Sequence, residues 1–256
     1  MRNYLIIVEG AHDIAVIEKV LSLNGINKRV NQEEDLPEVW KHVIPTRYPF
    51  EQSRLDRIAP IPSFVKNDNI SVAIKNATSD TEIIDTLQHM LHYMEIGDVA
   101  KLEGIMLICD ADLKNASKKR ETLLNMWEDT QELKLDKMNM QLETSVRKIP
   151  IYMFVFPDDC NPGNLENLLL ETAKVAYPEL LQWALEYIEK AADISKNLKR
   201  EQDAKKATIG CIANTMKPGK ANQVSIADND WITENTLREC EMLGKLDGAV
   251  KNMLDN

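Results

Sequence analysis

Acidic residues follow three short apolar segments of this chain, where together they could bind a metal ion. They are Glu9 after Tyr4–Val8, Asp110 and Asp112 after Ile105–Cys109, and Asp158 after Ile151–Phe156 and a proline. Clustered carboxylates repel one another, and a hard divalent cation with oxygen ligands is the usual partner that relieves this repulsion. Mg²⁺ fits best because it takes few carboxylates and keeps water molecules, with Mn²⁺ as the alternative ion. Such a site suits phosphoryl chemistry, in which the metal activates water and neutralises phosphate charge.

The three apolar segments have the length and composition of buried strands. Continuous apolar runs are typical of parallel strands that are covered on both faces. Ligands bind beyond the carboxyl ends of such strands. We therefore expect Tyr4–Val8 and Ile105–Cys109 to be adjacent parallel strands that bring Glu9 and Asp110 within reach of one ion. Asp158 or Glu166 should line the same crevice.

Single acids also have simpler explanations. Asp13 could only cap the helix that follows Gly10, and Asp158 could be a turn residue. The case for a metal site therefore depends on Glu9, Asp110 and Asp112 taken together.

Helices are predicted between and after the strands. The predicted elements are a helix over Ile14–Leu21 that stops near Gly25, a hairpin of Phe64–Lys66 and Ile70–Ile74, a helix from a Ser79/Glu82 capping box through Met94, and one long helix over Lys118–Gln141. From Pro162 onward the pattern is helical throughout. Pro162 and Pro178 suit first helical positions, a helix should span about Arg200–Met216, and a last helix should carry Leu237–Met253.

This order of elements predicts an α/β fold. We expect a mostly parallel, Rossmann-like sheet with helices on both faces and a helical C-terminal extension. Residues 1–176 should form the α/β core. Residues 177–256 should pack on that core within one structural domain, because no linker rich in Gly, Ser or Pro precedes them.

Composition limits the classes of partner. The chain has 256 residues and a net charge of −10, from 31 basic and 41 acidic residues, which argues against a protein that coats nucleic acid by charge alone. Its four cysteines lack the spacing of metal fingers, and no signal peptide is evident, so we expect a cytoplasmic location. The apolar runs have only strand length, which predicts no membrane segment. A locally basic stretch around Lys206 and the group Lys114–Arg120 could meet phosphates.

Two motifs resemble those of Toprim domains. Tyr-Leu-Ile-Ile-Val-Glu-Gly-Ala-His-Asp (residues 4–13) resembles the first Toprim motif, and Ile-Cys-Asp-Ala-Asp (108–112) resembles the Asp-x-Asp motif of the same fold. Phe-Pro-Asp-Asp (156–159) and Pro-Gly-Asn-Leu-Glu-Asn-Leu-Leu (162–169) are similar to stand-alone Toprim-like proteins of unknown function, which resemble the nuclease domain of the OLD family.

This resemblance implies a Mg²⁺ site. It assigns Glu9, Asp110 and Asp112 as metal ligands with catalytic roles, and Lys206 as a lysine beside the metal. The chain departs from the pattern in a long proline-rich stretch over residues 26–78. Leu113 follows the Asp-x-Asp motif with no further acid close by, so a second metal position is not apparent. The chain contains no G-x-x-x-x-G-K-[ST] run, so an ATPase partner would be a separate chain.

Three functions remain open. The first is a Mg²⁺-dependent nuclease, in which water attacks a phosphodiester and Lys206 stabilises the phosphate. The second is a non-catalytic Toprim-shaped binding or regulatory module that acts with a separately encoded partner such as an ATPase. The third is a nucleotide-sugar transferase, which also uses Asp-x-Asp after a strand. It ranks last because it does not explain Glu9, Gly10 and Asp13.

Overall fold

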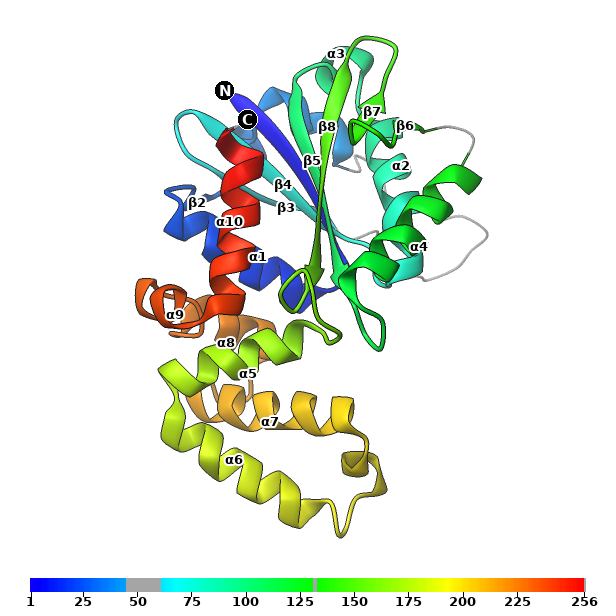
Figure 1. Ribbon diagram of the computed structural model, residues 1–256. Coiled ribbons are helices and arrows are strands. Elements are labelled where there is room, and N and C mark those ends of the chain that lie inside the picture. The colour runs from blue at the N-terminus through cyan, green and yellow to red at the C-terminus, as the bar shows by residue number, and fades with distance from the viewer. Residues whose placement is uncertain (45–60, 131–132, 256) are drawn as a thin grey trace, which may run out of the picture.

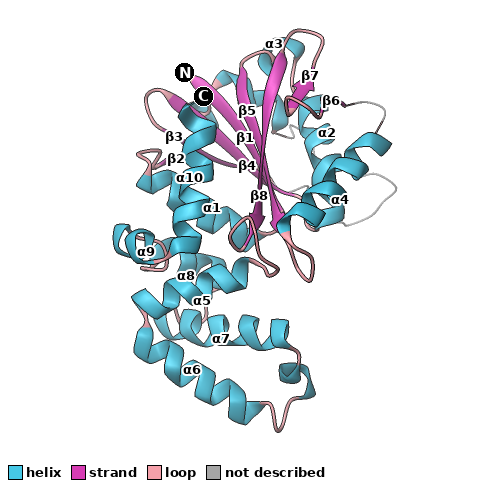
Figure 2. Cartoon of the chain, viewed as in Figure 1, coloured by secondary structure: helices cyan, strands magenta, loops and turns pink. Residues whose placement is uncertain are grey.

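The computed structural model describes residues 1–44, 61–130 and 133–255, and these form an α/β fold around an eight-stranded sheet (Figure 2). The strand order is β2-β3-β4-β1-β5-β8-β7-β6. The strands are β1 (Arg2–Val8), β2 (Lys28–Arg29), β3 (Ser63–Lys66), β4 (Ile70–Asn76), β5 (Leu102–Asp110), β6 (Lys134–Asp136), β7 (Gln141–Glu143) and β8 (Lys148–Phe156).

The centre of the sheet is parallel and its flanks are antiparallel. Strands β4, β1, β5 and β8 run in one direction, whereas β3 pairs antiparallel with β4 and β7 antiparallel with β8. Val8 at the end of β1 pairs with Asn76 of β4 and Ile108 of β5. The predicted adjacency of the first two acidic strands is thus confirmed.

Helices cover both faces of the sheet (Figure 1). Helices α1 and α10 pack on one face, and α2 and α4 pack on the other. The α-helices are α1 (Ala11–Leu23), α2 (Ile83–Tyr93), α3 (Ile96–Val99), α4 (Ala116–Asp129), α5 (Leu165–Ala176), α6 (Pro178–Ala191), α7 (Glu201–Met216), α8 (Asn222–Asp228), α9 (Glu234–Glu239) and α10 (Glu241–Asp255). Short 3₁₀ helices are η1 (Glu33–Asp35), η2 (Glu38–Val43), η4 (Asp80–Glu82) and η5 (Lys196–Lys199).

Strand β1 is buried on both faces because its side chains alternate between two apolar cores. Tyr4, Ile6 and Val8 belong to the core under α1 and α10, and Leu5 and Ile7 belong to the core under α2 and α4. All five side chains are fully buried. Burial of an aliphatic side chain is worth about 1.5–3 kcal/mol. This explains why a continuous apolar run, rather than an alternating one, forms the central strand.

The C-terminal helices lie beyond the carboxyl ends of the parallel strands. Figure 1 shows α5, α6 and α7 stacked at that end of the molecule, with α6 farthest from the sheet. Helix α10 returns along the sheet and packs against β5 and β8. The apolar core that contains Tyr4 and Ile6 also includes Ile209 of α7, Val250 of α10, and Trp231 from the segment between α8 and α9. The core therefore runs from the sheet into the helical part without a break.

Several local predictions need correction. The β3–β4 hairpin is present, but residues 45–60 of the proline-rich stretch lie outside the described residues. The single helix predicted over Lys118–Gln141 is wrong. Helix α4 ends at Asp129, and β6 and β7 form an antiparallel pair. These strands are too short and too exposed to show an apolar run.

Three helix ends also differ from the prediction. Ser79 makes no capping hydrogen bond, since its Oγ lies 2.9 Å from Thr81 Oγ1 and a 3₁₀ turn precedes α2. Helix α5 begins at Leu165 rather than at Pro162, with Asn164 as its N-cap residue. The last helix is two helices that meet at Cys240.

Within the described ranges, no helix combines the length and apolar character that crossing a membrane requires.

Candidate metal centre at the carboxyl edge of the sheet

Glu9 and Asp110 meet where β1 and β5 end. The parallel pairing of the two strands places both carboxylates at the same edge of the sheet. Glu9 Oε2 accepts a hydrogen bond from the main-chain N–H of Asp110 at 3.2 Å. The structure therefore brings together the two acids that the sequence placed at the centre of the site.

Helix α5 closes the site from the side of β8. Asp110 Oδ1 accepts a hydrogen bond of 2.9 Å from the N–H of Leu165, the first residue of α5. A helix N-terminus carries a partial positive charge and free N–H groups, so it favours a carboxylate there. Glu166 follows in the same turn and is buried. Its charge contributes to the raised pKa values of Asp13 and Asp110, so Glu166 acts on the same acidic group.

Asp13 belongs to the same group and also caps its own helix. Its Oδ2 accepts a hydrogen bond of 2.7 Å from the N–H of Gly10, the residue that precedes α1. Asp13 is buried, and the charges of Glu9 and Glu166 act on it. The capping role and the place in the acidic group therefore coexist in one side chain.

The buried acids favour their protonated forms. Burial, followed by the charges of Asp13 and Glu9, raises the pKa of Asp110 to about 9. Burial raises the pKa of Asp13 to about 7. Burial also raises the pKa of Glu9, although the N–H of Asp110 and the charge of Lys119 oppose the rise. With a pKa of about 9, Asp110 holds a proton at neutral pH unless a cation replaces it.

An amide oxygen next to this group lacks a partner. Asn164, the N-cap residue of α5, is buried, and its Oδ1 accepts no hydrogen bond from any residue in the described ranges. Asn164 immediately precedes Leu165, whose N–H binds Asp110. Carboxylate and amide oxygens are the hard ligands that Mg²⁺ takes in proteins, so the donor set at this edge fits that ion.

Asp112 pairs with a lysine. Its backbone is in the left-handed region, with φ 55°, and it forms an antiparallel bridge with Gly163. Its Oδ2 lies 3.6 Å from Nζ of Lys119. The two acids of the Asp-x-Asp motif therefore have different partners: Asp110 binds the N–H of Leu165, and Asp112 pairs with Lys119.

Lys119 is a site residue that the sequence reading missed. This lysine of α4 is only 3% exposed, and its Nζ lies 2.7 Å from Asp80 Oδ2 in η4. Burial lowers the pKa of Lys119, but the hydrogen bond to Asp80 and the negative charges around the ammonium together outweigh burial, and the pKa is raised. Two members of the segment Lys114–Arg120 are thus paired with acids, Lys119 with Asp80 and Arg120 with Asp159. Asp80 is 39 residues away from Lys119 in the chain, so no local pattern predicts that pair.

Asp158 is not brought to the acidic group. Its carboxylate accepts hydrogen bonds from the main chain of Cys160 and Asn161 and from the Asn161 side chain, and it lies 3.2 Å from Nζ of Lys245 in α10. Burial raises the pKa of Asp158, but these hydrogen bonds outweigh burial and lower it. Asp158 thus orders the loop between β8 and α5, which is the turn role that the sequence also allowed.

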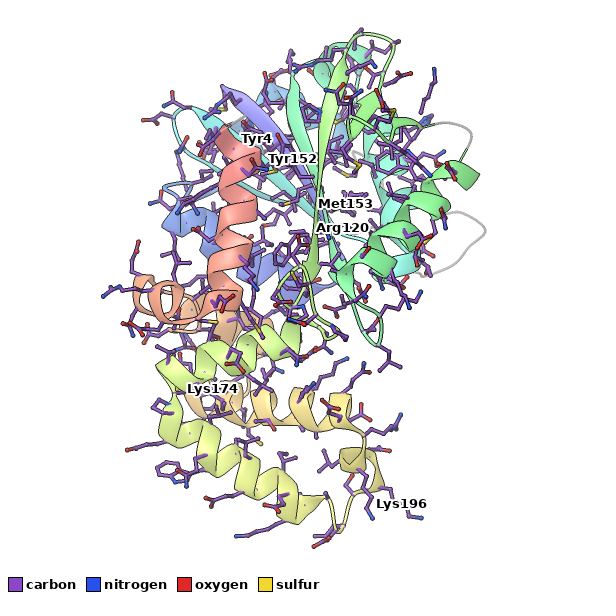
Figure 3. All side chains as sticks on the ribbon, in the orientation of Figure 1. Tyr4, Arg120, Tyr152, Met153, Lys174 and Lys196 are labelled. Carbon is purple, nitrogen blue, oxygen red and sulfur yellow. The ribbon has the colours of Figure 1, made fainter. Side chains whose placement is uncertain are left out.

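Lys206 lies on the exposed side of α7, near the first turn of α1. Burial lowers the pKa of His12, and the charge of Glu166 opposes this effect. The charge of Lys206 lowers the pKa of His12 further. The neighbouring Lys205 donates to Asn167 Oδ1 in α5 at 3.3 Å. The start of α7 thus presents lysines to the acidic edge, whereas Lys196 lies at the far end of the helical part (Figure 3).

A second group of possible ligands lies elsewhere, between η2 and α3. His42 Nε2 is 3.3 Å from Glu95 Oε1, and His42 Nδ1 is 3.4 Å from Asp98 Oδ2. The carboxylates face opposite ring nitrogens, and Lys101 also pairs with Asp98 at 2.7 Å. This arrangement suits ion pairs that join two short helices. The acids at the sheet edge are spaced more widely, which suits an ion that keeps several waters.

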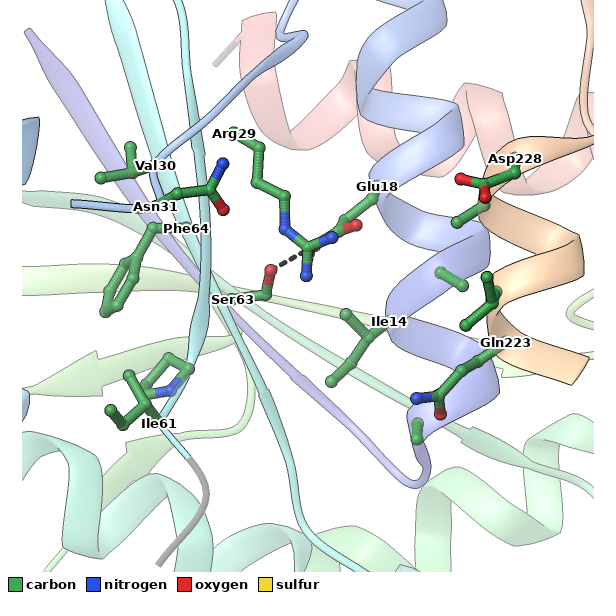
Figure 4. Close-up of a pocket in the computed structure, with 15 residues that line it drawn as sticks. Ile14, Glu18, Arg29, Val30, Asn31, Ile61, Ser63, Phe64, Gln223 and Asp228 are labelled. Atoms are coloured by element: carbon green, nitrogen blue, oxygen red, sulfur yellow. Dashed lines mark hydrogen bonds and ion pairs between the residues drawn. The ribbon is translucent and has the colours of Figure 1, made fainter. Parts of the chain in front are cut away.

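Two cavities flank the acidic edge without including Glu9 or Asp110. A cavity of about 540 Å³ runs along α1 from Ala11 to Glu18 and reaches Arg29, Ser63 and Asp228 (Figure 4). A cavity of about 660 Å³ lies between α4 and α10 over β8, where Arg120, Tyr152 and Met153 line it (Figure 3).

Comparison with known proteins gives a family but no activity. The chain belongs to the family described as "Protein of unknown function (DUF3226)", which it matches over residues 3–240. No curated protein matches the sequence at a significant level. Among solved structures, the chain is similar to the hypothetical protein PH0156 from Pyrococcus horikoshii OT3. The sequence identity is 21% and the TM-score 0.53, over 98% of this chain and 100% of the other. At this identity the likeness shows the fold alone.

Proposed function

We propose that this protein is a Mg²⁺-dependent phosphotransfer enzyme of the Toprim type, and most specifically a nuclease that cleaves phosphodiesters. The observation that carries the proposal is the meeting of Glu9 and Asp110 at the carboxyl edge of two parallel strands, with Asp13 and Glu166 beside them. The resemblance of both acidic motifs to Toprim motifs supports the same assignment.

Glu9 and Asp110 would hold the ion, with Asp13, Glu166 and Asn164 as neighbouring oxygen donors. A bound Mg²⁺ or Mn²⁺ would supply Lewis-acid chemistry, polarising a phosphate and activating water. The N–H of Leu165 fixes the orientation of Asp110, and the N–H of Asp110 fixes Glu9. Lys206 would attract the phosphate from α7, since it makes no ion pair with other described residues and is exposed.

The test is cleavage of nucleic acid by the full chain. Labelled single-stranded DNA, duplex DNA and single-stranded RNA would be incubated with Mg²⁺ or Mn²⁺, with EDTA as the metal-free control. We expect cleavage that requires the ion and is lost in Asp110→Asn and Glu9→Gln. Asp158→Asn is the matched variant, because Asp158 also follows a parallel strand and is buried, but it is bound to Asn161 and Lys245. Equal loss in all three variants would contradict the assignment.

A second candidate is a non-catalytic module that acts with a separate partner such as an ATPase. An exposed apolar surface favours it: Trp183 and Tyr187, one turn apart on α6, are 59% and 62% exposed. Exposed aromatic residues of this kind are frequent in protein interfaces. Calorimetric Mg²⁺ binding without cleavage of any of the three substrates would favour this candidate over the nuclease.

A further inference from the structure

Lys119 is placed where a cation is needed beside the candidate metal centre. Lysine is almost never fully buried unless it is paired, and here the side chain is only 4% exposed. Its ammonium joins three segments: α4, the η4 turn through Asp80, and the loop after β5 through Asp112. Removing a buried charge from water is costly, so a buried ammonium between two carboxylates must be compensated by them.

The charges around Glu9 divide into two sides. On one side lie Lys119, Asp80 and Asp112, all of which act on Glu9. On the other side Asp110 is surrounded by acids, with Asp13, Glu9 and Glu166 acting on it. The first side already has its cation in Lys119. On the second side the largest charge effects on Asp110 all come from acids.

Two-metal phosphotransfer sites use two ions about 3.5–4 Å apart, held by shared and separate carboxylates. A fixed ammonium can supply the charge of one of these ions without the second ion. We propose that Lys119 takes the place of the second cation, so that the centre binds one divalent ion on the Asp110 side while Asp112 serves as a partner of Lys119 rather than as a metal ligand. This inference rests on the proposed metal-dependent function.

Asp80 completes the arrangement. Nζ of Lys119 lies 2.7 Å from Oδ2 of Asp80 and 3.6 Å from Oδ2 of Asp112, so the ion pair with Asp80 is the stronger of the two. Lys119 therefore stays anchored by Asp80 while its charge acts on Asp112 and Glu9. This makes it a positioning residue that also sets how many ions the site accepts.

The number of bound ions tests this inference directly. Mn²⁺ would be titrated into the full chain, and the free ion would be followed by electron paramagnetic resonance. We expect one Mn²⁺ per wild-type chain. Two ions would overturn the role of Lys119 and leave the proposed function standing, whereas no bound ion would remove both.

Substitutions make the assignment specific. We expect Asp110→Asn to weaken Mn²⁺ binding by about tenfold or more, and Asp112→Asn to change it by less than about threefold. Equal losses in the two variants would overturn the inference, and this comparison does not depend on how a Lys119 variant folds.

Variants of the lysine provide the reciprocal experiment. Lys119→Met leaves two acids without their cation, and we expect it to bind a second Mn²⁺ and to gain more thermal stability from Mn²⁺ than wild type does. Lys119→Arg keeps the charge and should bind one ion. Lys118→Met, at an exposed neighbouring position on α4, is the matched control and should also bind one. A folded Lys119→Met protein that binds only one ion would overturn the inference.

Discussion

The N–H of Leu165 donates a 2.9 Å hydrogen bond to Oδ1 of Asp110 and so joins the start of α5 to the end of β5. The two residues are 55 positions apart in the chain. This one bond orients the carboxylate, satisfies an otherwise free N–H of the helix and brings Glu166 to the edge of the sheet. The candidate site is therefore assembled by the packing of the helical part against the sheet.

Substitution of Asp110 should separate its structural role from its binding role. Asp110→Asn keeps an oxygen that can accept from Leu165, so we expect metal-free stability at neutral pH to be level or higher, while Mg²⁺ affinity falls about tenfold or more. Asp110→Ala loses that acceptor as well, and should cost about 1 kcal/mol more in stability than Asn. Thermal unfolding and calorimetric Mg²⁺ titration would measure both effects. Unchanged Mg²⁺ affinity in Asp110→Asn would show that the acid is only structural.

The raised pKa values predict how stability changes with pH. Asp110 has an ordinary pKa of 3.8 and a folded pKa of about 9, so between these values the folded chain holds a proton that the unfolded chain has released. Asp13 behaves in the same way between 3.8 and about 7. The contribution of each acid to stability is therefore greatest below pH 3.8 and decreases as pH rises through its window.

This pH effect can be isolated by comparison with a variant. We expect metal-free wild type to lose stability relative to Asp110→Asn as pH is raised from about 5 to 9, because Asn cannot ionise. Mg²⁺ should stabilise wild type increasingly over the same range, since binding displaces protons. Urea unfolding at several pH values would measure the difference. A wild-type-minus-variant difference that does not change with pH would contradict the raised pKa of Asp110.

Gly163 should tolerate no side chain. Its φ is +138°, and an added Cβ would lie 2.9 Å from Asn167 Oδ1 and 3.2 Å from Pro157 Cδ. We expect Gly163→Ala to lower the free energy of unfolding by about 1–3 kcal/mol, because alanine is strained at this φ and its Cβ would clash with Asn167 and Pro157. Gly244→Ala is the control, since nothing lies near that position in α10 and alanine favours helix. The two variants should shift the urea midpoint in opposite directions.

The α/β core should not persist without the C-terminal helices. Val250 and Met253 of α10 are fully buried in the core that contains Tyr4 and Ile6. Loss of each such contact costs roughly 1.5–3 kcal/mol, and typical domains are stable by only about 5–15 kcal/mol. We expect limited proteolysis to yield no stable fragment of residues 1–176, and that fragment, when expressed, to lack a cooperative unfolding transition. A folded 1–176 fragment would divide the chain into two domains.

The sheet could be predicted from the sequence because its strands carry their own signal. The run Tyr4–Val8 is apolar at every position, and the structure buries both of its faces. The strands β6 and β7 carry no such signal, because only Leu142 among their residues is buried. A charged segment with a helical beginning therefore looked like one helix as far as Gln141.

The candidate site was predictable only in part, for a similar reason. Glu9 and Asp110 follow apolar strands, so their position at one edge comes from strand order. Asp112 pairs with Lys119, and Lys119 is held in place by Asp80 in a distant turn. Asp158 has the same sequence context as Glu9 but is satisfied within its own loop by Asn161. Such pairings arise from tertiary packing, which single-sequence patterns do not encode.

The packing of α10 against β1 has a consequence for how this chain is made. The hydroxyl group of Tyr4 donates to the carbonyl of Leu254 at 3.2 Å, and the side chain of Arg2 donates to the same carbonyl. The partners are about 250 residues apart, so contacts of the longest range close the fold. During synthesis, α10 can cover this face of β1 only after nearly the whole described chain has left the ribosome. Until then the apolar side chains of β1 depend on α1 or on a chaperone for protection from aggregation.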